Sequence, residues 1–128
     1  MTTAGMHPLI SHHLLLCATP TKAKCCDPAE GQDTWNALKR VVRDLGLEDD
    51  QRPEGIVLRS KVDCLRVCER GPILLIWPDG TWYADVTADR IEAILRSHIL
   101  DRQPIAQWIY KTTPFQNIQN KSSQTFHK

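Results

Sequence analysis

The chain has 128 residues, of which 16 are basic and 15 acidic, giving a formal net charge of +1. A chain of this length forms one domain and buries roughly two-thirds of its unfolded surface, so it can fold around a core of its own. The balanced charge argues against nucleic-acid binding, which needs a basic excess on one face. No segment approaches the ~20 apolar residues of a membrane span, and the run Leu14 to Leu16 is too short for a signal-peptide core.

The five cysteines argue against a disulfide framework. An odd number leaves one cysteine unpaired, and a domain of this size does not need the crosslinks of much smaller secreted scaffolds. We therefore expect a soluble protein in a reducing, cytoplasmic setting. In such a setting, cysteines that lie close together more often bind metal or take part in redox chemistry.

The first half of the chain predicts a strand, a helix and a second strand. The strand is a short leucine run, and the helix has apolar residues at helical spacing. Asp33 or Thr34 could cap the start of the helix, and Gly46 is placed to end it. Two strands joined through a helix are expected to lie parallel. The three elements span residues 13–17, 33–45 and 55–59.

The second half predicts a β-hairpin followed by a helix. Pro72 opens the apolar strand I-L-L-I-W, a position where a strand tolerates proline. Pro78-Asp79-Gly80 favours a turn, after which residues 81–85 would return antiparallel. Thr87 can cap a helix with an apolar stripe. The chain is therefore predicted to have an α/β fold, with a small mixed four-stranded sheet flanked by helices.

The chain is predicted to have three regions. Residues 1–11 form an N-terminal extension, and residues 12–110 form the folded domain. Residues 111–128 are rich in threonine, serine, asparagine and glutamine, and are expected to be a flexible C-terminal tail.

The cysteines follow the predicted strands. Cys17 comes at the end of the first strand, and Cys25 and Cys26 stand eight and nine positions later. Cys64 and Cys68 are four residues apart and follow the second strand, so a helical turn would place both sulfurs on one face. Open α/β sheets bind ligands at such strand ends. Four thiolates gathered from two places suit a 2Fe-2S cluster, in which each iron takes two protein ligands.

Other kinds of cysteine site agree less well with this spacing. Zinc knuckles pair cysteines two to four residues apart, and Cys17 is too far from Cys25 or Cys26 for that pattern. Thiol-disulfide exchange would need C-x-x-C before the first helix, and a Rieske centre would need two histidines in place of two cysteines, in C-x-H or C-x-x-H spacing. The sequence contains neither pattern. Spacing alone favours iron-sulfur, but it leaves zinc and plain buried or redox thiols open.

The remaining polar residues receive structural interpretations. His12 and His13 open a buried strand, which favours structural roles over ligation. His98 falls on the apolar stripe of the last helix and is expected to be a half-buried core residue. No arrangement for acid-base or nucleophilic catalysis can be read from the sequence, so an enzyme is not expected. Basic residues near the cysteines could offset thiolate charge, although ordinary solvated charge is the favoured interpretation. They are Lys22, Lys24, Lys61, Arg66 and Arg70.

Residues 64–83, C-L-R-V-C-E-R-G-P-I-L-L-I-W-P-D-G-T-W-Y, resemble the thioredoxin-like 2Fe-2S ferredoxins. These proteins are related to the thioredoxin-like iron-sulfur subunit of respiratory complex I and of some hydrogenases. The family pattern is C-x3-C, a Gly-Pro pair, an apolar strand and P-D-G-x-W-Y, and every part is present. A looser resemblance extends from His12 to about Phe115. It implies a thioredoxin-like fold, one 2Fe-2S cluster, and one-electron transfer to or from a redox partner protein.

The resemblance also implies a set of ligands. Cys17, Cys64 and Cys68 match family ligands, and a single further cysteine is expected before the first helix. Cys26 is preferred to Cys25, because counting back from Trp35 needs no gap. The chain would then be an electron carrier, alone or as a module of a larger oxidoreductase, and association into a homodimer is left open. The alternative is a thioredoxin-like binding module with a structural zinc, or no metal, and no redox role.

Overall fold

The computed structural model describes residues 9–18, 27–63, 65–67 and 69–116. Of the predicted ligands, only Cys17 lies within these ranges. Cys25, Cys26, Cys64 and Cys68 lie outside the described residues. The described elements, in chain order, are β1 (Ile10–Cys17), α1 (Pro28–Asp44), β2 (Ile56–Val62), β3 (Ile73–Trp77), β4 (Thr81–Tyr83), α2 (Ala88–Ile94), a π-helical stretch (Leu95–Leu100), a 3-10 turn (Ala106–Trp108) and β5 (Ile109–Thr112).

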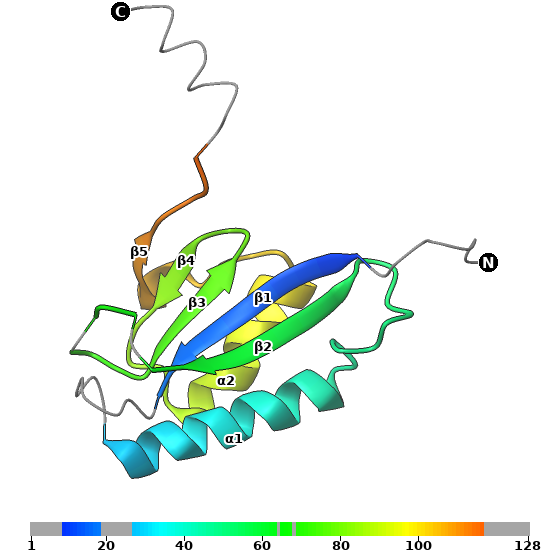
Figure 1. The fold of residues 1–128 in the computed structure, drawn as a ribbon. Helices are drawn as coiled ribbons and strands as arrows, with labels where there is room; N and C mark the ends of the chain where they lie inside the picture. Colours follow the sequence, from blue (N-terminus) through cyan, green and yellow to red (C-terminus); the bar gives the residue numbers. More distant parts are fainter. Residues whose placement is uncertain (1–8, 19–26, 64, 68, 117–128) are drawn as a thin grey trace, which may run out of the picture.

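The described strands form one mixed sheet in the order β2-β1-β3-β4-β5 (Figure 1). The pair β1–β2 is parallel, as predicted for two strands joined through a helix, and the other pairs are antiparallel. The β3–β4 hairpin, with its turn at residues 78–80, is also confirmed. Because β1 lies between β2 and β3, the segment from the end of β2 to the start of β3 must pass the end of β1.

The sheet is larger than the four strands predicted. Strand β5 pairs with β4 and contains Lys111 and Thr112, both assigned to the tail from their polar character. An edge strand with exposed side chains needs no apolar pattern, which explains why the sequence did not reveal it. At the N-terminal boundary of the predicted domain, β1 begins at Ile10, two residues before residue 12. The sheet therefore extends beyond both boundaries of the range 12–110.

Helix α1 begins at Pro28, five residues before the predicted residue 33. Asp27 caps it, because its carboxylate accepts a hydrogen bond from the Glu30 N–H at 3.2 Å. Thr34, one of the two predicted caps, is instead buried within the helix, and its hydroxyl donates to the Val86 carbonyl at 2.9 Å. The predicted end is confirmed, since Gly46 follows the helix with φ of +68°.

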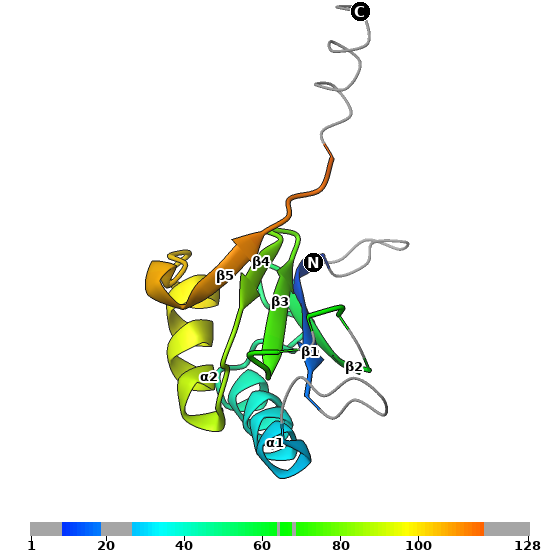
Figure 2. The same cartoon turned by 90° about the vertical axis from the view of Figure 1, so that its left-hand side faces the viewer.

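Both helices pack on the same face of the sheet, as Figure 2 shows edge-on. Because side chains alternate along a strand, Leu14 and Leu16 of β1 face the helices. Leu15 and Cys17 point to the opposite face, where a second and smaller apolar cluster lies. Its buried members are Cys17, Val67, Ile73, Leu75, Trp82 and Ala84.

The second helix follows the prediction at its start. Thr87 occupies the N-cap position of α2, and the π-helical stretch Leu95–Leu100 continues the helix. His98 lies in that stretch and is buried. No helix among the described residues is both long and apolar enough to cross a membrane.

Two truncations test whether β5 and the residues that follow it stabilise the fold. Phe115 stacks on Trp77 with ring centroids 4.2 Å apart, and the Trp82 indole N–H donates to the Thr113 hydroxyl at 2.7 Å. Ending the chain after Phe115 keeps β5 and these contacts, so the midpoint of thermal unfolding should not change. Ending it after Trp108 removes them, and should lower the free energy of unfolding by about 2 kcal/mol or more. Equal melting temperatures for the two truncations would contradict this role of β5.

Candidate metal centre

Cys17 is the last residue of β1 and is only 1% exposed. Its sulfur lies 3.4 Å from the backbone oxygen of Asp63, to which the thiol donates a hydrogen bond. In the sheet, Cys17 is opposite Val62 of β2 and opposite Ile73 of β3. The intervening segment, residues 63–72, therefore begins on one side of Cys17 and ends on the other. This segment carries Cys64 and Cys68 in its sequence.

The middle of the segment 63–72 packs beside Cys17. Val67 is only 6% exposed and belongs to the same apolar cluster as Cys17, and Leu65 packs against that cluster. In sequence, Leu65 follows Cys64 and Val67 precedes Cys68. The described neighbours of both predicted ligands thus bury apolar side chains on the sheet face toward which Cys17 points.

The end of the segment is fixed by backbone hydrogen bonds. The Asp85 N–H donates to the Arg70 carbonyl at 2.7 Å, and the Val86 N–H donates to the Pro72 carbonyl at 2.9 Å. The Gly71-Pro72 bond, whose isomer the sequence could not settle, is cis. The chain that leads back to β3 is therefore tied to the connection between β4 and α2.

A close backbone contact brings the start of α1 to the same end of the sheet. A Cβ atom built on Gly31 would lie 1.6 Å from the carbonyl oxygen of Ala18, the residue after Cys17. Only glycine allows this approach, and Ala18 itself is fully buried. The cap residue Asp27 directly follows Cys26 in sequence. The sequence analysis did not single out Gly31, although a glycine in the first turns of a helix was a usable signal.

Two of the basic residues near the cysteines in sequence have partners of their own. The Arg70 guanidinium pairs with the Asp85 carboxylate at 2.9 Å. The Lys61 ammonium lies 6.0 Å from the centre of the Trp35 ring of α1, on the helix-covered face. These contacts support the interpretation of ordinary surface charge. The N-terminal end of α1 also lies at the Cys17 end of the sheet, but the Asp27 carboxylate caps it and offsets the positive end of the helix dipole.

The described donor fits an iron-sulfur ligand. Thiolate sulfur is the ligand that 2Fe-2S clusters take from cysteine, and Cys17 is a buried sulfur donor backed by apolar side chains.

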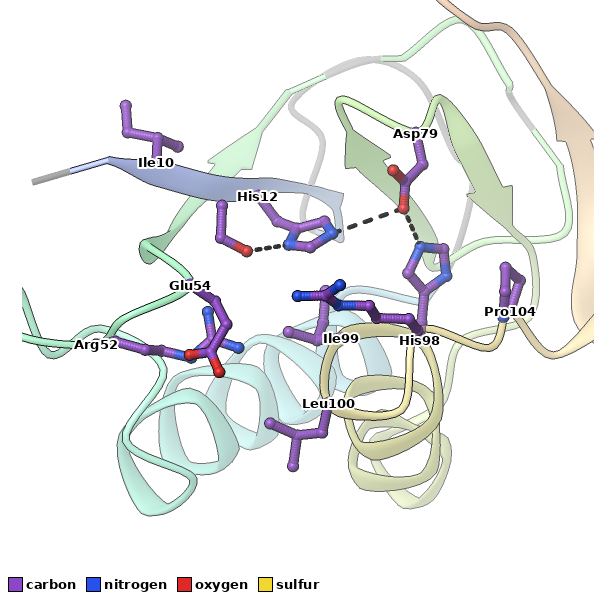
Figure 3. A pocket seen from close by; sticks show the side chains of 11 residues that line it. Ile10, His12, Arg52, Glu54, Asp79, His98, Ile99, Leu100 and Pro104 are labelled. Carbon is purple, nitrogen blue, oxygen red and sulfur yellow. Dashed lines mark hydrogen bonds and ion pairs between the residues drawn. The ribbon is translucent and has the colours of Figure 1, made fainter.

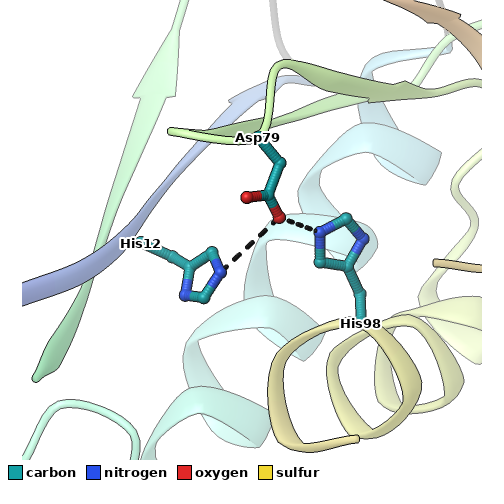
Figure 4. A group of neighbouring side chains, drawn as sticks. All are labelled: His12, Asp79 and His98. Atoms are coloured by element: carbon teal, nitrogen blue, oxygen red, sulfur yellow. Dashed lines mark hydrogen bonds and ion pairs between the residues drawn. The ribbon is translucent and has the colours of Figure 1, made fainter. Parts of the chain in front are cut away.

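A second polar cluster lies near the start of β1, beside a cavity of about 740 Å³ (Figure 3). His12, Asp79 and His98 converge there from β1, the β3–β4 turn and the π-helical stretch (Figure 4). The His98 side chain is 1% exposed, so it is more deeply buried than the half-buried position expected for it. The pKa of His12 is lowered, with burial as the main cause. Burial also raises the pKa of Tyr83, whose hydroxyl contacts His98.

Comparison with known proteins first defines the class of fold. The structure resembles a thioredoxin-like [2Fe-2S] ferredoxin from Aquifex aeolicus with a TM-score of 0.64 and 19% identity, over 83% of this chain and 97% of that one. A second solved structure, of a cysteine-to-serine variant of the Aquifex protein, gives a TM-score of 0.64 and 18% identity over 79% and 99% of the two chains. The chain therefore has a thioredoxin-like fold.

Sequence comparison then gives the family. No family model matches the chain. A 2Fe-2S ferredoxin of Clostridium pasteurianum is 32% identical over 89 residues, covering 69% of this chain and 84% of that protein. A 2Fe-2S ferredoxin of Aquifex aeolicus is 28% identical over 46 residues, covering 36% and 41%. The chain belongs to the thioredoxin-like 2Fe-2S ferredoxins.

Proposed function

We propose that this chain is an electron carrier that holds one 2Fe-2S cluster and exchanges single electrons with a redox partner protein. When bound, the cluster supplies reversible one-electron chemistry. Family membership supports this role, as does one structural observation: buried Cys17 lies between the two ends of the segment that carries Cys64 and Cys68.

The proposed ligands are Cys17, Cys26, Cys64 and Cys68, with Cys25 as the alternative to Cys26. Cys17 is held by strand pairing on both sides, and the Val67 side chain anchors the segment 63–72 against the sheet. Ligands held by a rigid sheet change little in position when charge is added or removed. Backbone N–H groups near the sulfurs are expected to tune the reduction potential.

The chain is an electron carrier and not an enzyme in its own right. We propose that it serves a reductase or oxidoreductase, as a separate protein or as a module of a larger one. The odd cysteine count and the absence of a disulfide pattern favour a reducing, cytoplasmic setting. Association of two chains into a homodimer is a further proposal.

Metal analysis and electron paramagnetic resonance test this function. Anaerobically purified chain should be reddish brown and contain about two irons and two acid-labile sulfides. Reduction with dithionite should produce the signal of one unpaired electron per cluster. Colourless protein that holds zinc, or no metal, would instead support the alternative of a thioredoxin-like binding module without a redox role.

A further inference from the structure

The cluster of His12, Asp79 and His98 lies far from the proposed iron-sulfur site. His12 is near the start of β1 and Cys17 is at its end, so the two positions are roughly 16 Å apart along the strand. The ligand-type atoms of the three side chains all lie within 4.8 Å of one another. The electron-carrier role makes no use of this cluster.

Both imidazoles turn the same nitrogen toward the shared carboxylate. His98 Nε2 lies 2.5 Å from Asp79 Oδ2, and His12 Nε2 lies 3.6 Å from the same oxygen. Figure 4 shows the two rings on either side of the carboxylate. Two imidazole nitrogens and one carboxylate are the three protein ligands of many open zinc sites.

The other nitrogen of each ring is already held by a hydroxyl group. His12 Nδ1 contacts the Ser11 hydroxyl, and His98 Nδ1 lies 2.7 Å from the Tyr83 hydroxyl. The Tyr83 oxygen also accepts the Ile105 N–H at 3.1 Å, which fixes its place. Metal-ligating histidines are typically oriented by such a contact at the second nitrogen. A hydroxyl can donate or accept, so either tautomer of His98 can be accommodated.

The site also has room and access. The adjoining cavity of about 740 Å³ is open to solvent next to Asp79, whose side chain is 41% exposed and belongs to a turn (Figure 3). Two ligand atoms at about 2.0–2.1 Å from a tetrahedral zinc ion lie about 3.3 Å apart, so the contact between Asp79 and His98 must open by about 0.8 Å. A carboxylate on an exposed turn can make this shift. Water can then complete the coordination.

The positive charge of Arg52 in the same cavity is partly compensated. Its guanidinium donates to the Gly55 carbonyl at 2.7 Å and lies 3.6 Å from the Glu54 carboxylate. Arg102 also lines the cavity and is exposed to solvent. Screening by water weakens its repulsion of a bound cation.

We propose that His12, Asp79 and His98 form a binding site for one Zn²⁺ ion, separate from the iron-sulfur ligands. The ion would join the start of β1, the β3–β4 turn and the π-helical stretch, which are far apart in the sequence. With three protein ligands and an open position for water, the site would take zinc reversibly. Its role would be to stabilise this end of the fold.

The test titrates ZnCl2 by calorimetry into chelator-treated full-length protein with its iron-sulfur cluster assembled. One zinc ion should bind per chain, with no loss of the visible absorbance of the cluster. Asp79→Asn and His12→Gln should each weaken binding by about a hundredfold. His13→Gln is the matched control, because His13 points to the opposite sheet face, where Nε2 contacts the Ser60 hydroxyl at 2.9 Å.

X-ray absorption at the zinc edge separates this site from the cysteines. The bound zinc should show only nitrogen and oxygen neighbours, with the outer-shell pattern of two imidazoles. Sulfur neighbours, or no zinc binding by the unaltered protein, would overturn the proposal. Equal affinity in the Asp79→Asn, His12→Gln and His13→Gln proteins would overturn it as well. Iron and sulfide contents of the same samples report on the electron-carrier function independently.

Discussion

Replacing Cys64 or Cys68 with serine should remove most of the iron-sulfur absorbance of the purified protein. Each cysteine is expected to supply one of four thiolates, and a hydroxyl oxygen is a poorer ligand for iron than a sulfur. Cys17→Ser should have the same effect, because Cys17 at the end of β1 is one of the four proposed ligands. Visible absorption and iron content measure the loss, with circular dichroism to confirm that the variants fold.

The adjacent pair Cys25 and Cys26 provides the internal control. If one of them is a ligand, only one of the two serine variants should lose the cluster, and the sequence match predicts that it is Cys26→Ser. Loss of the cluster in Cys25→Ser alone would instead identify Cys25 as the ligand in place of Cys26. Near-normal cluster content in all five serine variants would reject a cluster held by these cysteines.

Replacing Gly31 with alanine should destabilise the protein, although glycine-to-alanine changes inside helices usually stabilise. The added Cβ would meet the Ala18 carbonyl at 1.6 Å, so the first turn of α1 must move away from the end of β1. We expect a loss of about 1–3 kcal/mol in the free energy of unfolding, measured in denaturant. Cluster content should fall too, because α1 starts directly after the segment that carries Cys26.

Gln32→Ala is the matched control for Gly31→Ala. Gln32 is exposed in the same turn, and its amide bonds only the neighbouring Asn36 side chain among the contacts described for it. That change should leave both stability and cluster content nearly unaltered. An equally stable or more stable Gly31→Ala protein would show that the start of α1 does not depend on this backbone contact.

Much of the fold follows from patterns that are local in the sequence. The apolar strand I-L-L-I-W, the turn at Pro78-Asp79-Gly80 and the helix stop at Gly46 are each specified by a few adjacent residues, and the structure confirms all three. The start of α1 was misplaced because Asp27 and Thr34 are both good cap residues. The choice between them depends on Thr34 being buried against the Val86 carbonyl. Strand β5 was missed because its pairing with β4 stabilises it, and its own composition is polar.

The candidate sites, too, were partly predictable from local sequence patterns and partly not. Cys17 could be placed at a strand end from the leucine run before it, and the C-x3-C motif and the family resemblance suggested its partners. The contact between Gly31 and Ala18 joins residues from different elements, so no pattern within one element reveals it. The same holds for the convergence of His12, Asp79 and His98, which come from a strand, a turn and a helix.

The two apolar clusters on opposite faces of the sheet imply an order of events during biogenesis. The buried members described for the larger, helix-covered cluster include no cysteine, whereas Cys17 belongs to the smaller one. We therefore expect a newly synthesised apoprotein to form this larger cluster before any iron is bound. Loading of the cluster would then be confined to one face and one end of a preformed framework, where the surroundings of the buried Cys17 thiol must open while the rest stays folded.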